Sequence, residues 1–210
     1  MKRLVALALL AAFLLPVSAS AGVYEDMLNA VKMKDMRKVG DLLQRGMDVN
    51  TSDSWGNSLL MLAAQNGDLP VIELLLRNKA KVLTKNKYGD SALMLAALRG
   101  HSKAAAALVA AGAEIDPDGW TPLIYASFGG HAEMVRFLVA LDIDIDAQAK
   151  NGMTALMAAC RNGHLEIVKI LLEHDADLTL VAQDGLTALD IAASAGNKEI
   201  GIELSRAAGR

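Results

Sequence analysis

A short pattern that occurs five times constrains the fold of this chain more than any other feature. Each copy opens with glycine, has Ser or Thr two residues later, continues through an apolar stretch and closes with a second glycine. The copies are Gly56–Gly67, Gly89–Gly100, Gly119–Gly130, Gly152–Gly163 and Gly185–Gly196. Their opening glycines lie 33, 30, 33 and 33 residues apart. Because a fixed period of this length is typical of stacked supersecondary units, we expect a solenoid that offers a long surface to a partner.

The residues inside each copy predict two helices per unit. A hydroxyl side chain before an apolar stretch caps the start of a helix, and proline suits the first helical position, where Pro122 stands. The second glycine supplies the left-handed backbone that ends a helix, and a second apolar segment follows it. The predicted capping residues are Ser58, Ser91, Thr121, Thr154 and Thr187.

These copies resemble the ankyrin repeat, whose pattern is roughly D-G-x-T-P-L-H-x-A-A-x-x-G-H followed by V-x-x-L-L. The segment GMTALMAACRNGHLEIVKILL, residues 152–172, is close to that pattern. The resemblance implies an all-α solenoid of helix-turn-helix units joined by β-turn loops. It also implies a domain over residues 22–210, with an N-terminal cap at about 22–50 and five repeats at about 51–210. Within the cap, DLLQRGMDVN looks like the second helix and turn of a half-unit.

The sequence departs from the ankyrin pattern in two ways, and each departure predicts a structural difference. The histidine of T-P-L-H is absent from all five units, so the usual polar tie between neighbouring turns is in doubt. The residues in its place are Met61, Met94, Ile124, Met157 and Asp190. The 30-residue spacing marks a three-residue deletion just before Asp118, with Pro117 stiffening the shortened turn. Because the helix before it, SKAAAALVAAG, is rich in alanine, residues 100–120 are the predicted weak point of the stack.

The first residues, 1–21, have the form of a secretory signal peptide. Lys2 and Arg3 form a basic start, Leu4 to Leu15 form an apolar core, and Ala19-Ser20-Ala21 supplies a small-residue cleavage site. The apolar core is short for a membrane span, and an uncleaved anchor is the alternative. No cysteine follows the core, which disfavours a lipid anchor. We therefore expect a periplasmic protein or, alternatively, one secreted to the medium.

Composition argues against nucleic acid and gives little support to catalysis. Without Lys2 and Arg3, 19 basic residues stand against 24 acidic ones, whereas phosphate binding favours a basic stripe. Cys160 is the single cysteine of the sequence, so no internal disulfide forms, and a small core residue is its expected role. None of the common hydrolase, zinc-protease or phosphate-loop motifs occurs. We expect no catalytic residues and no cofactor.

Three groups of residues contain side chains that can bind metals, but a structural role is the favoured interpretation of each. His101, His131 and His164 recur once per unit, and units about 10 Å apart do not bring their rings to one ion. The cluster of Met27, Met33 and Met36 could hold Cu(I), but its helical spacing favours packing. The alternating acidic stretch 142–146 lacks the residues of a calcium loop. We therefore predict no metal site.

The resemblance places partner contacts on the turn tips and the exposed ends of the first helices. By register, the predicted partner-binding residues are Trp55, Asn57, Gln65, Tyr88, Asp90, Leu98, Arg99, Trp120, Phe128, Asn151, Met153 and Arg161. Aromatic and arginine side chains in this set are typical of interface hot spots, although the rings could instead stabilise the stack.

The function that these residues favour is binding of another protein through the concave face by a non-enzymatic monomer. Two roles stay open within that function: an immunity protein that neutralises a secreted toxin, and a helper of an envelope stress-response enzyme such as a catalase. A groove enzyme and a structural spacer are the less favoured alternatives.

We expect export to leave a mature chain that begins at Gly22, because Ala19 and Ala21 provide the small side chains that a signal peptidase recognises. The intact mass of the exported protein measures this cleavage. A cytoplasmic product that retains Met1 to Ala21 would contradict the predicted localisation.

Overall fold

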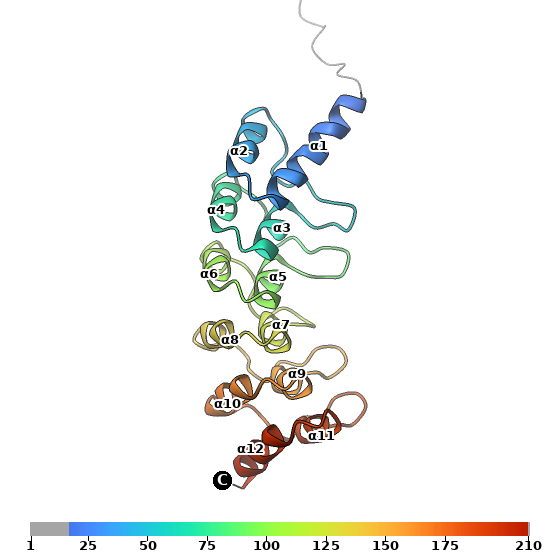
Figure 1. Ribbon diagram of the computed structural model, residues 1–210, viewed down its shortest axis with the longest axis vertical. Coiled ribbons are helices and arrows are strands. Elements are labelled where there is room, and N and C mark those ends of the chain that lie inside the picture. The colour runs from blue at the N-terminus through green and yellow to red at the C-terminus, as the bar shows by residue number, and fades with distance from the viewer. Residues whose placement is uncertain (1–16, 210) are drawn as a thin grey trace, which may run out of the picture.

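A computed structural model describes residues 17–209 of the chain as a stack of helix pairs (Figure 1). Residues 1–16 of the predicted signal peptide lie outside this range, and residues 17–21 begin the first helix. The helices are α1 Val17–Lys32, α2 Met36–Gln44, α3 Leu59–Asn66, α4 Leu69–Arg77, α5 Ala92–Leu98, α6 Ser102–Ala110, α7 Pro122–Gly129, α8 Ala132–Val139, α9 Ala155–Asn162, α10 Leu165–Glu173, α11 Ala188–Ser194 and α12 Lys198–Ala208. Over the described residues there are no strands, so the predicted all-α solenoid is confirmed.

The helices form two parallel layers. Odd-numbered helices α1 to α11 contact one another in order, and even-numbered helices α2 to α12 form the second layer (Figure 1). The apolar core runs continuously between the layers, from Met27 to Leu204. Each unit therefore buries its apolar face against its neighbours, as in other repeat arrays.

The first helix of each of the five repeats begins where the sequence predicts. The hydroxyl oxygens of Ser58, Ser91, Thr121, Thr154 and Thr187 accept hydrogen bonds from backbone N–H groups three residues later. Pro122 occupies the first turn of α7. The closing glycines all have positive φ, from 66° at Gly67 to 79° at Gly130, which a side chain would strain. Capping chemistry thus explains the boundaries of these helices.

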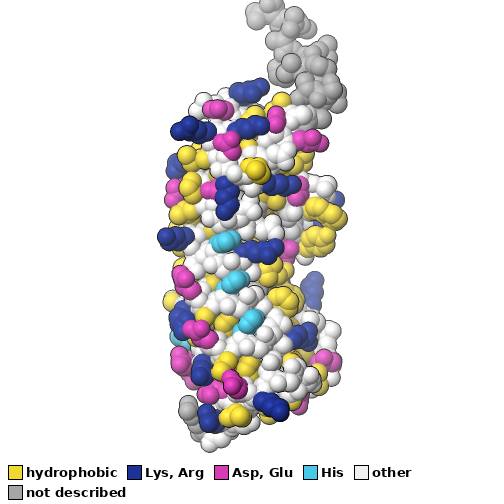
Figure 2. Space-filling view, viewed as in Figure 1, with side chains coloured by type: hydrophobic (Ala, Val, Ile, Leu, Met, Phe, Trp, Pro, Cys, Tyr) yellow, Lys and Arg dark blue, Asp and Glu magenta, His cyan; other side chains and the backbone are white. Residues whose placement is uncertain are grey.

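Polar ties between units persist despite the missing histidine of the T-P-L-H motif. Histidines that follow the closing glycines reach back to backbone carbonyls of the preceding unit, and they form a row down one face (Figure 2). The ring Nε2 atoms of His101, His131 and His164 lie 3.2, 2.9 and 3.2 Å from the carbonyl oxygens of Gln65, Leu98 and Phe128. Asn197 continues the row with a 2.7 Å bond to the Cys160 carbonyl.

Two of the methionines that replace the missing histidine do more than fill space. The backbone N–H of Ser58 donates to the Met61 sulfur at 3.4 Å, and that of Ser91 donates to the Met94 sulfur at 3.1 Å. A thioether is a weak acceptor, so these contacts satisfy an N–H group without the strength of an imidazole. Met61 and Met94 are therefore buried core residues that also act as weak acceptors.

The loops that precede the odd-numbered helices share a hydrogen-bonded turn, with one exception. The turn is closed in four loops by backbone bonds such as Asn86 N–H to the Asp90 carbonyl, 3.0 Å, and Ala149 N–H to the Met153 carbonyl, 2.9 Å. The loop before α7 has lost three residues and makes no such bond. Figure 1 shows that this loop projects less far than the loops on either side of it.

The N-terminal segment differs from the half-unit that its sequence indicates. Before α2 stands a full first helix, α1, which contacts α3 as the other odd-numbered helices contact their neighbours. The apolar residues Met27, Leu28 and Val31 of α1 are buried in the common core. Met27 is thus a packing residue, whereas Met33 and Met36 are exposed. Among residues 17–209, no helix is both long and apolar enough to span a membrane.

We expect hydrogen exchange to be fastest, among the internal units, over residues 100–120. Helix α6 buries Ala104, Ala105 and Leu108, whereas α4 buries Val71, Ile72 and Leu75. Each missing buried methylene removes about 0.8 kcal/mol of apolar stabilisation, and the following loop lacks its turn bond. Native-state exchange followed by mass spectrometry measures the difference, with residues 67–87 as the internal reference. Equal protection of the two segments would contradict this expectation.

Candidate functional site: an aromatic loop face with a notch

Two exposed aromatic rings lie side by side at the tips of neighbouring loops. Trp55 belongs to the loop before α3 and Tyr88 to the loop before α5, and their ring centroids are 6.1 Å apart in a stacked arrangement. Their residues are 57% and 69% exposed, although large aromatic side chains are usually covered in a folded monomer. Two adjacent exposed rings make an apolar patch of the kind that marks interaction surfaces.

A second aromatic cluster surrounds the start of α7. The ring of Trp120 lies 5.2 Å from that of Tyr125 and 5.9 Å from that of Phe128, the latter pair edge to face. Trp120 and Tyr125 are half-buried, whereas Phe128 is exposed. The four aromatic residues predicted for this face therefore lie in two groups, and Tyr125 joins the second one.

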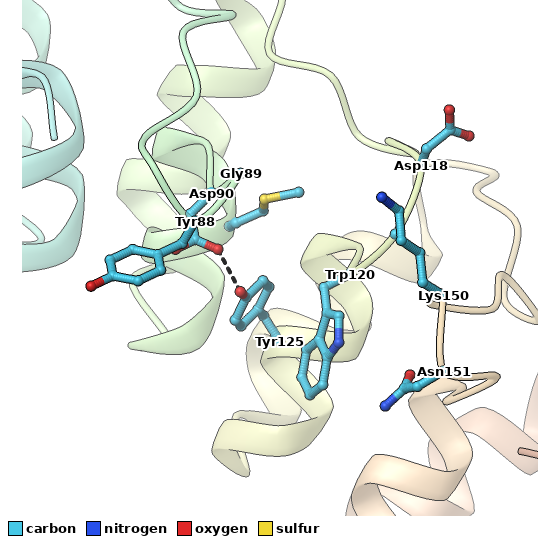
Figure 3. A pocket seen from close by; sticks show the side chains of 10 residues that line it. Tyr88, Gly89, Asp90, Asp118, Trp120, Tyr125, Lys150 and Asn151 are labelled. Atoms are coloured by element: carbon cyan, nitrogen blue, oxygen red, sulfur yellow. Dashed lines mark hydrogen bonds between the residues drawn. The ribbon is translucent and has the colours of Figure 1, made fainter. Parts of the chain in front are cut away.

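The short loop before α7 leaves a notch between its two neighbours. The notch has a volume of about 430 Å³ and is lined by Tyr88, Gly89, Asp90, Met94, Asp118, Gly119, Trp120, Tyr125, Lys150 and Asn151. Figure 3 shows Tyr125 and Trp120 between two walls, with Asp90 on one side and Lys150 and Asn151 on the other. The ring of Tyr88 points away from the notch (Figure 3), and it stacks on the ring of Trp55.

A chain of side-chain hydrogen bonds connects the loops and ends at Tyr125. The Asn57 amide donates to Asp53 at 3.0 Å, and the Asn86 amide donates to Asn57 at 2.8 Å and to Asp90 at 3.2 Å. The Tyr125 hydroxyl then donates to the other oxygen of Asp90 at 2.5 Å (Figure 3). In the preceding pair of loops, Asn86 donates to Asn57 from the next loop, whereas Asp90, at the position equivalent to Asn57, receives its bond from Tyr125 of α7. Tyr125 thus compensates for the deleted loop residues.

The surroundings of Asp53 and Tyr125, the two ends of this chain of hydrogen bonds, shift the pKa values of both groups. Burial, the hydrogen bond to Asp90 and the charge of Asp90 together raise the pKa of Tyr125 well above its ordinary value. At the other end, burial acts to raise the pKa of Asp53, but hydrogen bonds from Asn57 and Trp55 outweigh it and lower that pKa. Asp53 is therefore a stable carboxylate acceptor, and Tyr125 is a neutral donor, near neutral pH.

The other predicted contact residues divide by exposure. Arg99, Asn151 and Arg161 are exposed, and Gln65 and Leu98 are half-buried at the ends of α3 and α5. Asn57 and Asp90 are half-buried and engaged in the hydrogen bonds between loops. Their side chains shape the face rather than extend from it.

Met153 is a correction to the predicted contact set. Its side chain is only 4% exposed and lies in the apolar core, so it does not reach a partner on the loop face. Trp120, at the equivalent position of the preceding unit, is half-buried, whereas Met153 is buried in the core. Sequence register alone does not distinguish these two cases.

Tyr125 is the site residue that the sequence interpretation missed. It occupies the position of Leu62 and Leu95 in the preceding units, where an apolar core residue is the ordinary expectation. The sequence nevertheless contains an indication of this role. Among the five repeats, only the unit that follows the three-residue deletion has a tyrosine at this position. A polar aromatic tip beside a missing loop indicates that the hydroxyl replaces a lost partner.

The remaining candidate reactive groups have structural surroundings. Cys160 is fully buried, and burial raises the pKa of its thiol to about 12, which makes it a poor nucleophile. Burial lowers the pKa of His101, whose ring faces the Gln65 carbonyl. No group of three or more His, Cys, Asp or Glu side chains among the described residues is arranged to hold a metal ion.

The helix pairs, capped loops and stacked units define a repeat solenoid, and comparison with known proteins specifies its family. A sequence profile described as ankyrin repeats (3 copies) matches residues 27–118, 60–149 and 141–207. The chain belongs to the ankyrin-repeat family, as the resemblance of its motifs implies. None of the curated proteins matches it significantly.

Two solved structures illustrate this similarity. One is a chain in the structure of the Bd0816 predatory endopeptidase from Bdellovibrio bacteriovorus in complex with immunity protein Bd3460, with 31% identity and a TM-score of 0.77. The match covers 86% of this chain and 97% of that one. The other is the human ASB11 ankyrin repeat domain, with 26% identity, a TM-score of 0.80 and coverage of 86% and 82%.

We expect Tyr125→Phe to lower the free energy of unfolding by about 1–2 kcal/mol, because it removes a hydrogen bond to a carboxylate and leaves Asp90 short of a donor. Urea unfolding followed by circular dichroism measures the change. Tyr88→Phe is the matched control, since the exposed Tyr88 hydroxyl bonds to no described residue. Equal stability of both variants with the wild type would show that the Tyr125 hydroxyl is dispensable.

Proposed function

We propose that this chain is an exported, non-enzymatic protein that binds another protein through its loop face and the adjoining ends of its first helices. The observation that carries the proposal is the pair of stacked, exposed rings of Trp55 and Tyr88 beside the aromatic notch. Aromatic anchors of this kind dominate the energetics of protein interfaces. Ankyrin repeats mediate protein–protein binding, which agrees with this assignment.

Several features support a binding role over catalysis. The buried Cys160 thiol, the histidines paired with backbone carbonyls and the hydrogen-bonded Tyr125 each have a structural task. Tyr125 lines the notch, but its hydroxyl is bonded to Asp90 and its pKa is raised, so near neutral pH it is a neutral donor rather than a base or nucleophile. The form of residues 1–21 supports export, with the periplasm as the proposed destination and the medium as the alternative.

An immunity role is the second candidate, favoured by one comparison. The similar structure from Bdellovibrio bacteriovorus contains an immunity protein bound to a predatory endopeptidase, and 97% of the matched chain is covered at 31% identity. A protein with this role would bind a secreted enzyme of its own cell and block its activity. The role of helper to a stress-response enzyme has no comparable support in the structure.

Affinity capture from periplasmic extract and culture medium tests binding and separates these roles. The purified chain serves as bait, and mass spectrometry identifies what it retains. Retention of a secreted hydrolase, together with inhibition of its activity, would support immunity. Retention of a catalase or another stress enzyme would support the helper role. Capture of nothing from either source, with a correctly folded bait, would count against the binding function.

We expect Trp120→Ala and Tyr88→Ala each to weaken binding of the captured partner by about 2 kcal/mol or more, roughly 30-fold in affinity, because hot-spot aromatics bury large areas. Calorimetric titration measures the change, and circular dichroism verifies folding. Ile202→Ala, which truncates an exposed apolar residue of α12 away from the loop face, is the control and should bind as the wild type does. Unchanged affinity in both aromatic variants would place the partner elsewhere.

A further inference from the structure

Backbone hydrogen bonds link neighbouring loops at two places in the stack. The Lys87 N–H donates to the Trp55 carbonyl at 3.1 Å, and the Gln183 N–H donates to the Asn151 carbonyl at 3.0 Å. In both cases the donor stands two residues before a loop glycine and the acceptor stands one residue before the glycine of the preceding unit. At each of these two places a single backbone hydrogen bond joins the edges of neighbouring loops.

This linkage is interrupted on both sides of the loop before α7. The position equivalent to Lys87 is Pro117, which has no N–H to donate to the Tyr88 carbonyl. On the other side, the Lys150 N–H would reach the Asp118 carbonyl in a loop of regular length, but the shortened loop makes no such bond. Neither the Tyr88 carbonyl nor the Lys150 N–H is engaged with any described residue, and both residues are exposed.

These two free backbone groups belong to residues that face each other across the notch. The walls of the notch in Figure 3 are the loop of Tyr88 and the loop of Lys150, with Trp120 and Tyr125 between them. The Tyr88 carbonyl can accept a hydrogen bond and the Lys150 N–H can donate one. An extended peptide that lay between the two loops could therefore bond to both through its own backbone.

The charges and rings of the notch favour a basic side chain on that peptide. Two carboxylates, Asp90 and Asp118, line it against the single ammonium of Lys150. The half-buried rings of Trp120 and Tyr125 also line the notch, and a guanidinium stacks on aromatic rings better than an ammonium does. The net charge of the whole chain, −3, also attracts a basic partner surface.

From this arrangement we infer that the notch binds an extended segment of the partner protein that carries an arginine. The segment donates a backbone N–H to the Tyr88 carbonyl and accepts from the Lys150 N–H, and its guanidinium lies against Trp120 near Asp90 and Asp118. This inference rests on the proposed protein-binding function and specifies the chemistry of the partner at one point of the face.

A short peptide tests the inference without the partner. The probe is the capped pentapeptide acetyl-Thr-Val-Arg-Val-Thr-amide, titrated to millimolar concentration into ¹⁵N-labelled protein and followed by NMR. We expect saturable shifts of the Lys150 amide and the Trp120 indole, with the Lys87 and Gln183 amides unaffected. The same peptide with citrulline in place of arginine keeps the shape without the charge and should bind at least tenfold more weakly.

N-methylated versions of the peptide test whether its backbone pairs with the walls of the notch. One peptide is N-methylated at both valines and another at the arginine and second threonine, which blocks opposite edges of the extended strand. Only one of the two should bind. Equal binding of both would overturn the backbone pairing, and equal binding of the citrulline peptide would overturn the arginine. Absent shifts, or shifts spread over the whole chain, would overturn the site.

A loop-restored variant tests the same site from the protein side. Insertion of Ala-Gln-Ala between Asp116 and Pro117, combined with Pro117→Lys, recreates the sequence of the regular loop at 146–150. We expect this variant to fold and to lose at least tenfold in affinity for the peptide. Trp120→Leu, which keeps an apolar residue, serves if the insertion fails to fold and should weaken peptide binding by a similar factor.

The outcome is separable from that of the proposed function. If the peptide does not bind while Tyr88→Ala still abolishes capture of the partner, the loop face binds protein and the inference about the notch is wrong. If the peptide binds as described while nothing is captured from extract or medium, the notch is a peptide site and the proposed function lacks its partner.

Discussion

The close approach of the first helices is the constraint on which the rest of this structure depends. At the same position of each of the five repeats stands a fully buried alanine: Ala63, Ala96, Ala126, Ala159 and Ala192. A larger side chain there would force neighbouring units apart, because packed interiors have no room for extra methylenes. The spacing set by these alanines brings each loop to the next, so that backbone and side-chain hydrogen bonds can join them.

The sequence predicted the stack and its helix boundaries because these depend on local chemistry. The hydroxyl caps, Pro122 and the closing glycines act within a few residues of the chain, and all stand where the pattern placed them. The histidine row was visible as a repeat, but its role as a tie to the preceding unit required the geometry of the stack. The sequence left a polar tie between neighbouring turns in doubt, and histidines at a different position connect the units.

The candidate site was less predictable because it arises between units. Trp55, Tyr88, Trp120 and Phe128 were assigned to one face by register, yet their rings form two separate clusters. Met153 has the same register as Trp120 but is buried in the apolar core. Tyr125 was absent from the predicted set because its hydroxyl partner, Asp90, is 35 positions away in the chain. Deletions therefore need to be interpreted together with the residues that surround the resulting space.

The three-residue deletion also has a consequence for the order of the units. In a regular array with one shared pattern, any internal unit can stand in the place of another, and duplication or exchange of units preserves the surface. Here Tyr125 follows the short loop before α7, and its hydroxyl bonds to Asp90 of the preceding unit. A permuted array would still stack its helices, but it would separate these residues. The order of units in this chain thus carries information that its periodicity does not.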